Sequence, residues 1–319
     1  MRKHLFILLF FIGSLAQATA GKDKLVSFPK AEILSEHATR IPFKLIDNLI
    51  IIEAELMDRR GNFIIDTGSE TLILNKSHFK SKATKHHESR STSGVIDLID
   101  NPLEKMLKEF IINDIKLENK HSDVIDLSHI ESSKKIHLLG IIGYNILKDY
   151  EVFIDMYLNQ ITLTRIDKNG DRLDKRPMLE TIVDTVDFQL KRHTIVLETY
   201  VDDHKLKFGL DTGAEYNQLN KRSSRKILKY FYPSERLMLM GASGKKIEVM
   251  AGKLYRVKLT DNIYFAPMET LLTNLNQLNE AFGTSLDGVL GYEFFRQQRT
   301  IINYKKEKLY FVNNPLYKQ

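Results

Sequence analysis

The tripeptide Asp-Thr-Gly occurs twice in this chain of 319 residues, at positions 66–68 and 211–213. In each copy an apolar stretch runs directly into the aspartate, residues 63–65 before Asp66 and residues 208–210 before Asp211. Two carboxyl groups that lie close together cannot both ionise cheaply, so they share a proton and titrate as a coupled pair. The ionised member then takes a proton from a water molecule, and the protonated member donates to a carbonyl oxygen under attack.

The two aspartates belong to an internal repeat, which explains why one motif occurs twice. They are 145 positions apart (211 − 66), and at that offset residues 43–69 fall without a gap on residues 188–214. A second block, residues 138–155, matches residues 286–303 at an offset of 148 (291 − 143). The chain is therefore a tandem duplication of one unit. Packing of the two copies about a pseudo-two-fold axis would bring Asp66 and Asp211 together.

The elements around each aspartate are predicted to be β-strands. Residues 50–56 and 195–201 are rich in β-branched side chains, and residues 59–62 and 202–205 have the composition of turns. Each hairpin therefore returns as the strand that ends at its aspartate, where the glycine allows a tight turn. Further strand pairs are predicted at 152–154 with 161–163 and at 300–302 with 309–311, and short helices at 144–147 and 292–295.

Two more helices are predicted in the second half. The first has Leu271, Leu275, Leu278 and Phe282 at three- and four-residue spacing. The second lies within the basic run 221–229, with Ile227 and Leu228 facing inward. Turns are predicted at residues 91–94 and 241–244.

The pairing of an apolar-apolar-Asp-Thr-Gly-Ser/Ala loop with an apolar-Gly-apolar-apolar-Gly element resembles the two-domain retropepsin-like and pepsin-like aspartic proteases. The double occurrence is similar to the bacterial clan AA aspartyl proteases, and the resemblance covers residues 43–311. It implies an all-β fold of two homologous β-barrel lobes with a catalytic cleft between them. It also implies an aspartic endopeptidase that acts as a monomer on a polypeptide substrate. By analogy, the turns at 91–94 and 241–244 would be flaps over the cleft.

The resemblance also implies roles for individual residues. Asp66 and Asp211 would be the catalytic pair, with Thr67 and Thr212 bracing the two loops against each other. Gly68 and Gly213 would present backbone N–H groups to the carboxylates. Ser69 would hydrogen-bond Asp66, whereas Ala214 has no hydroxyl, so an uneven pair is expected. Gly140, Gly143, Gly288 and Gly291 are interpreted as scaffold that lets the backbone pass close behind the aspartate loops.

Two departures from the family pattern limit this analogy. The first expected flap contains no tyrosine, and the second aspartate loop continues with the more polar residues 215–218. Since a fold does not guarantee an activity, an alternative stays open: a catalytically inactive peptide- or glycan-binding protein on the same scaffold.

The N-terminus has the pattern of a secretory signal, with a basic start, an apolar run at 5–15 and small residues at 18–20. The predicted organisation is a signal peptide at 1–20, an extension at 21–40 without a counterpart in the second half, a first lobe at 41–166, a linker at 167–178 and a second lobe at 179–319. The mature protein is expected in the periplasm or outside a bacterial cell, without stable membrane insertion.

Composition narrows the remaining function classes. The chain has no cysteine, which excludes disulfides, thiol nucleophiles and cysteine metal sites. The net charge of +6 falls to +4 without Arg2 and Lys3, and the basic residues are scattered, so nucleic-acid binding is not expected. His78, His86 and His87 lack neighbouring ligands in the sequence and are interpreted as exposed residues. No cofactor and no metal are expected.

Overall fold

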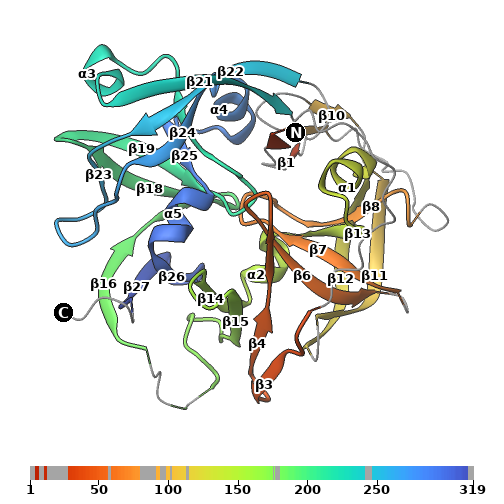
Figure 1. Cartoon of the computed structure of the whole chain (residues 1–319). Coiled ribbons are helices and arrows are strands. Elements are labelled where there is room, and N and C mark those ends of the chain that lie inside the picture. Colours follow the sequence, from red (N-terminus) through yellow and green to blue (C-terminus); the bar gives the residue numbers. More distant parts are fainter. Residues whose placement is uncertain are drawn as a thin grey trace.

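The computed structural model describes residues 28–56, 59–79, 103–112, 115–174, 176, 180–240 and 246–314. It also gives the backbone of four short strands: β1 (His4–Phe6), β2 (Phe11–Ile12), β9 (Ser91–Ser93) and β10 (Leu98–Asp100). The chain is an all-β protein of two lobes joined by a shared sheet (Figure 1).

The first lobe is a sheet of seven strands in the order β11-β12-β8-β13-β7-β6-β5. It closes on itself because β11 also pairs with β6, through Ile111 and Glu55. Runs such as residues 49–52 and 138–142 are buried along their whole length, as expected for strands covered on both sides. The strands are β5 (Lys44–Ile46), β6 (Leu49–Leu56), β7 (Arg59–Ile65), β8 (Leu72–Asn75), β11 (Leu103–Ile112), β12 (Ile115–Ile125) and β13 (Leu138–Ile142).

The second lobe repeats this arrangement in a ten-stranded sheet in the order β17-β18-β19-β25-β20-β24-β22-β21-β2. The tenth strand, β23, follows β22 along the chain and pairs with β18, so the sheet curls back on itself as in the first lobe. Besides β2, its strands are β17 (Gln189–Lys191), β18 (Thr194–Val201), β19 (His204–Leu210), β20 (Asn217–Asn220), β21 (Phe231–Met240), β22 (Lys246–Leu254), β23 (Val257–Lys258), β24 (Met268–Thr273) and β25 (Gly288–Leu290).

A third sheet, of seven strands, joins the lobes in the order β16-β27-β26-β14-β15-β4-β3. Its centre is the antiparallel pair β14 and β26, in which Phe153 pairs with Ile301. These two residues are also equivalents in the repeat, being 148 positions apart (301 − 153), so the pseudo-two-fold axis passes between them. The strands are β3 (Glu32–Ser35), β4 (Ala38–Pro42), β14 (Tyr150–Asp155), β15 (Gln160–Arg165), β16 (Ile182–Asp187), β26 (Arg299–Asn303) and β27 (Lys308–Val312).

The structure corrects, for residues 38–40 only, the expectation that residues 21–40 have no counterpart. Strand β4 begins inside this segment and pairs with β15, with Thr39 opposite Leu163. In the second half β16 pairs with β27 in the same register, with Asp184 opposite Phe311. When residues 38–42 (ATRIP) are aligned with residues 183–187 (VDTVD), no position is identical. The sequence alone therefore does not show that the two strands are equivalent.

The helices are short: α1 (Ser128–Lys134), α2 (Tyr144–Leu147), α3 (Arg225–Leu228), α4 (Asn276–Phe282) and α5 (Tyr292–Gln297). The predicted helices at 144–147 and 292–295 are confirmed as α2 and α5, and the one in the basic run as α3 with Ile227 buried. The helix expected from Leu271 onward begins later, because Leu271 lies in β24 and pairs with Ala251 and Gln218.

The predicted aspartate hairpins are confirmed as β6–β7 and β18–β19, and the later strand pairs as β14–β15 and β26–β27. The turn predicted at 59–62 lies within β7, since Arg59 already pairs with Leu56, and of the turn predicted at 202–205 only residues 202–203 lie outside the strands, since His204 pairs with Val201. The turn predicted at 91–94 is wrong for residues 91–93, which form strand β9 and pair with β10, while residue 94 lies outside the described residues. Residues 241–244 also lie outside the described residues, between the paired strands β21 and β22.

The described part of the chain contains no helix that is both long and apolar enough to cross a membrane. Most of the predicted signal peptide lies outside the described residues, so export stays a prediction, as do the domain boundaries.

One large hydrophobic core runs through both lobes and the shared sheet, and each lobe adds a smaller cluster beneath α1 or α4.

Candidate active site

The two Asp-Thr-Gly loops meet at the boundary between the lobes. Each aspartate follows the end of its strand, β7 or β19, and its backbone N–H donates to the strand beside it. Asp66 donates to the carbonyl of Ile142 at 3.0 Å, and Asp211 to that of Leu290 at 2.9 Å. The duplication thus gives both aspartates the same local structure, and the two copies face each other across the pseudo-two-fold axis.

The threonines of the two loops lock them together. The backbone N–H of Thr67 donates to the hydroxyl of Thr212 at 3.0 Å, and the N–H of Thr212 donates to the hydroxyl of Thr67 at 3.0 Å. Each hydroxyl then donates to a carbonyl of the opposite lobe, Thr212 to Ile65 at 2.8 Å and Thr67 to Leu210 at 3.3 Å. Four buried hydrogen bonds therefore cross the lobe boundary at this point, in the arrangement that the sequence analysis expected.

The carboxyl groups of Asp66 and Asp211 lie close enough for their charges to interact, both residues are buried, and the Oδ2 atom of each has no hydrogen-bond partner among the described residues. The Oδ1 atom of Asp66 accepts the N–H groups of Gly68 at 2.8 Å and Ser69 at 3.0 Å. The Oδ1 atom of Asp211 accepts the N–H of Gly213 at 2.8 Å. Gly213 also lies flat against the first carboxyl group, since a Cβ atom there would stand 2.6 Å from Asp66 Cγ.

The role expected for Ser69 is corrected in part. Its backbone N–H bonds Asp66, but its hydroxyl has no hydrogen-bond partner among the described residues. The N–H of Ala214 donates to the carbonyl of Asp211 at 3.3 Å rather than to its carboxyl group. The pair is therefore uneven, as expected, but the backbone rather than a missing hydroxyl makes it so.

This unevenness sets the protonation of the pair. Burial raises the pKa of Asp66 to about 6, although the neighbouring Asp211 and the N–H groups of Gly68 and Ser69 lower it. Burial, and then the charge of Asp66, raise the pKa of Asp211 well above its ordinary value. A carboxylate that accepts more N–H groups carries the negative charge more readily. Asp66 is therefore the member that ionises first, and Asp211 the member that keeps the proton.

The glycine elements lie behind the loops, as interpreted from the sequence. A Cβ atom on Gly143 would stand 2.4 Å from the carbonyl oxygen of Thr71 and 2.6 Å from that of Ser69. A Cβ atom on Gly291 would stand 2.3 Å from the carbonyl oxygen of Ala214. Only a residue without a side chain lets these backbones pass so closely.

Sequence reasoning missed a second set of contacts across the lobes. Asn48 donates to the carbonyl of Glu215 at 3.1 Å, and its repeat equivalent His193 lies 3.9 Å from the carboxylate of Glu70. Burial lowers the pKa of His193 to about 3, so its ring is neutral. The signal was present in the repeat, where Glu70 and Glu215 follow the two motifs at the same interval.

Glu215 also forms a buried ion pair with Lys134 of α1, which comes from the other lobe. The side chains are 1% and 2% exposed, and Lys134 reaches Asp47 as well, at 3.0 Å. The loop that carries Asp211 is therefore tied to the first lobe by charge, in addition to the threonine bonds.

Comparisons with known proteins agree with the fold. No family model matches the chain, and no curated protein sequence matches it. Among solved structures, an aspartic proteinase from Irpex lacteus superposes with a TM-score of 0.52 at 9% identity, covering 87% of this chain and 98% of that one. The chain therefore has a pepsin-like aspartic proteinase fold, and at this identity the similarity extends to the fold alone.

Proposed function

We propose that the protein is an aspartic endopeptidase in which Asp66 and Asp211 activate a water molecule held between them. The observation that carries the proposal is the contact between two buried carboxyl groups, one from each lobe, with pKa values raised by burial. Titratable groups with strongly shifted pKa values and a specific charged partner are typical of catalytic sites.

The uneven hydrogen bonding assigns the two roles. Asp66, the ionised member, takes a proton from the water, whose oxygen attacks the carbonyl carbon of the peptide bond. Asp211 donates its proton to the carbonyl oxygen, so a neutral tetrahedral diol forms. The proton held by Asp66 then passes to the amide nitrogen, and Asp211 takes a proton back from the diol as the C–N bond breaks. No cofactor takes part.

The substrate class follows from the fold, which is that of an aspartic proteinase. A peptide bound between the lobes in an extended conformation would bind partly through its backbone. We propose a polypeptide as substrate, a single chain as the active unit because both aspartates come from it, and a location outside the bacterial cytoplasm from the N-terminal pattern. Nucleic acid is not proposed as a partner.

A binding experiment separates this function from a catalytically inactive peptide- or glycan-binding protein. A statine-type peptide places a hydroxyl where the attacking water would lie, so its affinity depends on both aspartates. Calorimetry should show at least about a tenfold tighter binding of this peptide than of its deoxy analogue, and Asp66→Asn or Asp211→Asn should abolish the difference. Equal affinity of the two peptides for the unaltered protein would favour the binding-protein alternative.

A further inference from the structure

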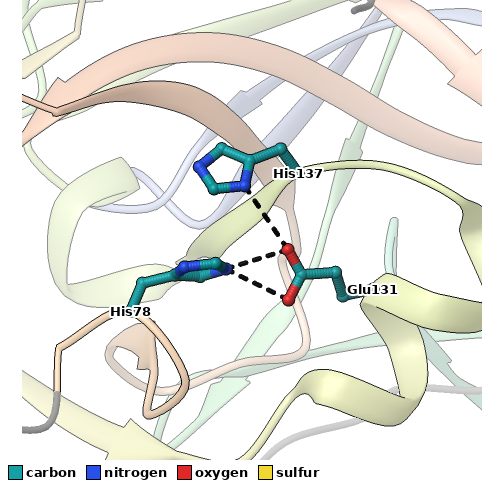
Figure 2. Close-up of side chains that lie close together, drawn as sticks. All are labelled: His78, Glu131 and His137. Carbon is teal, nitrogen blue, oxygen red and sulfur yellow. Dashed lines mark hydrogen bonds and ion pairs between the residues drawn. The ribbon is translucent and has the colours of Figure 1, made fainter. Parts of the chain in front are cut away.

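Three side chains with metal-binding atoms converge in the first lobe, outside the aspartate pair (Figure 2). The Nε2 atom of His78 lies 2.8 Å from Oε1 and 3.1 Å from Oε2 of Glu131. The Nδ1 atom of His137 lies 3.6 Å from the same Oε1 atom, and all three ligand atoms lie within 4.8 Å of one another. The interpretation of His78 as an exposed residue without neighbouring ligands is wrong, because its side chain is only 20% exposed and contacts Glu131, 53 positions further along the chain. His86 and His87 lie outside the described residues.

Three different elements deliver these side chains. His78 lies in the turn after β8, Glu131 on α1, and His137 directly before β13. The carboxylate is held in place by two further donors, the side-chain amide of Asn75 at 3.0 Å and the backbone N–H of Leu138 at 3.1 Å. Hydrogen bonds of this kind orient a carboxylate in metal sites.

The second lobe provides an internal comparison, because its backbone repeats the same turn and helix. His78 donates its N–H to the carbonyl of Asn75 at 3.0 Å, and Ser223 donates to that of Asn220 at 2.9 Å. The helices α1 and α4 both end in a left-handed residue, Lys135 and Gly283. The equivalents of His78, Glu131 and His137 are Ser223, Asn279 and Ser285.

This comparison separates what the fold needs from what the first lobe adds. The side-chain oxygen of Asn279 accepts the N–H of Leu286 at 2.7 Å, as Glu131 accepts that of Leu138. The fold therefore requires an acceptor at this position, and a neutral amide suffices. Two imidazoles and a carboxylate are not needed to close the helix, and they are gathered in one lobe only.

We propose that His78, Glu131 and His137 bind one divalent transition-metal ion of the zinc class. Zinc takes imidazole nitrogen and carboxylate oxygen ligands at about 2.0–2.2 Å, which in a tetrahedron separates the ligand atoms by about 3.3–3.6 Å. The separations of 2.8 and 3.6 Å lie below this range and at its upper end, so small rotations of the side chains admit the ion. Imidazole ligands disfavour magnesium and calcium.

The solvent exposure of the three side chains and the elements that carry them are those expected of an accessory metal site. The side chain of His137 is 54% exposed, which leaves an approach from solvent and a fourth position for water, whereas His78 and Glu131 are each 20% exposed. The ion would join β8, α1 and β13. Helix α1 carries Lys134, which pairs with Glu215 of the other lobe, so the ion stabilises the lobe and its boundary rather than taking part in peptide hydrolysis.

The test measures zinc bound by the full mature chain after chelation and buffer exchange. The second lobe supplies the design for the variant His78→Ser/Glu131→Asn/His137→Ser, which removes the ligands and keeps the acceptor for Leu138. His78→Ser and His137→Ser alone serve if the triple variant does not fold. His121→Ser, an exposed histidine of the same lobe, is the matched control.

We expect calorimetry with ZnCl₂ to give one ion per chain at micromolar or tighter affinity for the wild type and for His121→Ser. Each single ligand variant should weaken binding at least about tenfold, since second-sphere changes alone weaken metal sites by ~10–100-fold. Zinc should also raise the melting temperature of the wild type but not of the triple variant. Failure of the wild type to bind zinc, or equal binding by the triple variant, would overturn the proposal.

Discussion

Thr67 and Thr212 exchange two hydrogen bonds of equal length, 3.0 Å, across the boundary between the lobes. The exchange is possible only because the same tripeptide occurs in both halves and the lobes pack about a pseudo-two-fold axis. It fixes the separation of the two aspartates, each of which directly precedes one of these threonines.

The threonine exchange predicts the effect of removing one hydroxyl. In Thr212→Val the N–H of Thr67 and the carbonyl of Ile65 lose their buried partner, at about 1–3 kcal/mol for each group. We therefore expect urea unfolding to show a loss of roughly 2–6 kcal/mol. Thr212→Ser keeps the hydroxyl and should stay within about 1 kcal/mol of the wild type. Equal losses in both variants would mean that the methyl group, and not the hydrogen bonds, matters.

The contact of Gly213 with Asp66 predicts a steric effect on the aspartate pair. In Gly213→Ala the new Cβ atom would stand 2.6–2.8 Å from the carboxyl atoms of Asp66, so the pair must separate. Peptide cleavage should fall at least about a hundredfold, as expected when a catalytic group moves by about 1 Å. The control is Gly209→Ala in β19, whose Cβ atom would meet only the ends of two side chains, Leu286 at 3.1 Å and Thr194 at 3.8 Å. A fully active Gly213→Ala would contradict the geometry of the pair.

The buried ion pair between Lys134 and Glu215 predicts a large loss when one partner is removed. Lys134→Met leaves the carboxylate of Glu215 buried, and breaking such pairs costs about 3–5 kcal/mol. The double variant Lys134→Met/Glu215→Gln should recover part of the loss, which chemical denaturation measures. Arg236 and Glu248, 68% and 57% exposed at 3.1 Å, form the control pair, and their coupling should not exceed about 1 kcal/mol. Similar couplings for both pairs would refute the role of burial.

The raised pKa of Asp66 predicts how stability changes with pH. A carboxyl group whose pKa is higher in the folded protein favours folding below its ordinary value of 3.8, and this contribution is lost as the pH rises through about 6. A shift of this size corresponds to about 3 kcal/mol. Asp66→Asn lacks this loss, so its stability relative to the wild type should increase between about pH 4 and pH 7.

A second buried group, His193, also makes stability depend on pH, and its contribution has the opposite sign. Its pKa is lowered to about 3 by burial, so acid destabilises the folded protein as the pH falls below 6.5. Both proteins carry this residue, and its effect cancels in their difference. A stability difference between wild type and Asp66→Asn that does not vary with pH would show that the carboxyl group of Asp66 is not perturbed.

Much of this structure follows from the repetition of short patterns. Because the Asp-Thr-Gly loops and the glycine elements occur twice at nearly constant spacing, the duplication, the pairing of Asp66 with Asp211 and the strands that carry them were predictable. Contacts that depend on the packing of distant elements were not. Strands β4 and β16 have no identical residue when they are aligned, so their equivalence was not predictable. Lys134 contacts Glu215 only after the two lobes assemble. The cluster of His78, Glu131 and His137 likewise needs three elements in place.

The central claim is that one chain hydrolyses peptide bonds with Asp66 and Asp211. Cleavage of a peptide library by the mature protein across acidic and neutral pH tests it most directly, beside Asp66→Asn, Asp211→Asn and the exposed control Asp261→Asn. We predict cleavage by the wild type and Asp261→Asn, rising as the pH passes about 6 where Asp66 ionises and falling once Asp211 loses its proton. Both active-site variants should be inactive. Cleavage that survives Asp211→Asn, or a folded wild type that cleaves no peptide, would contradict the claim.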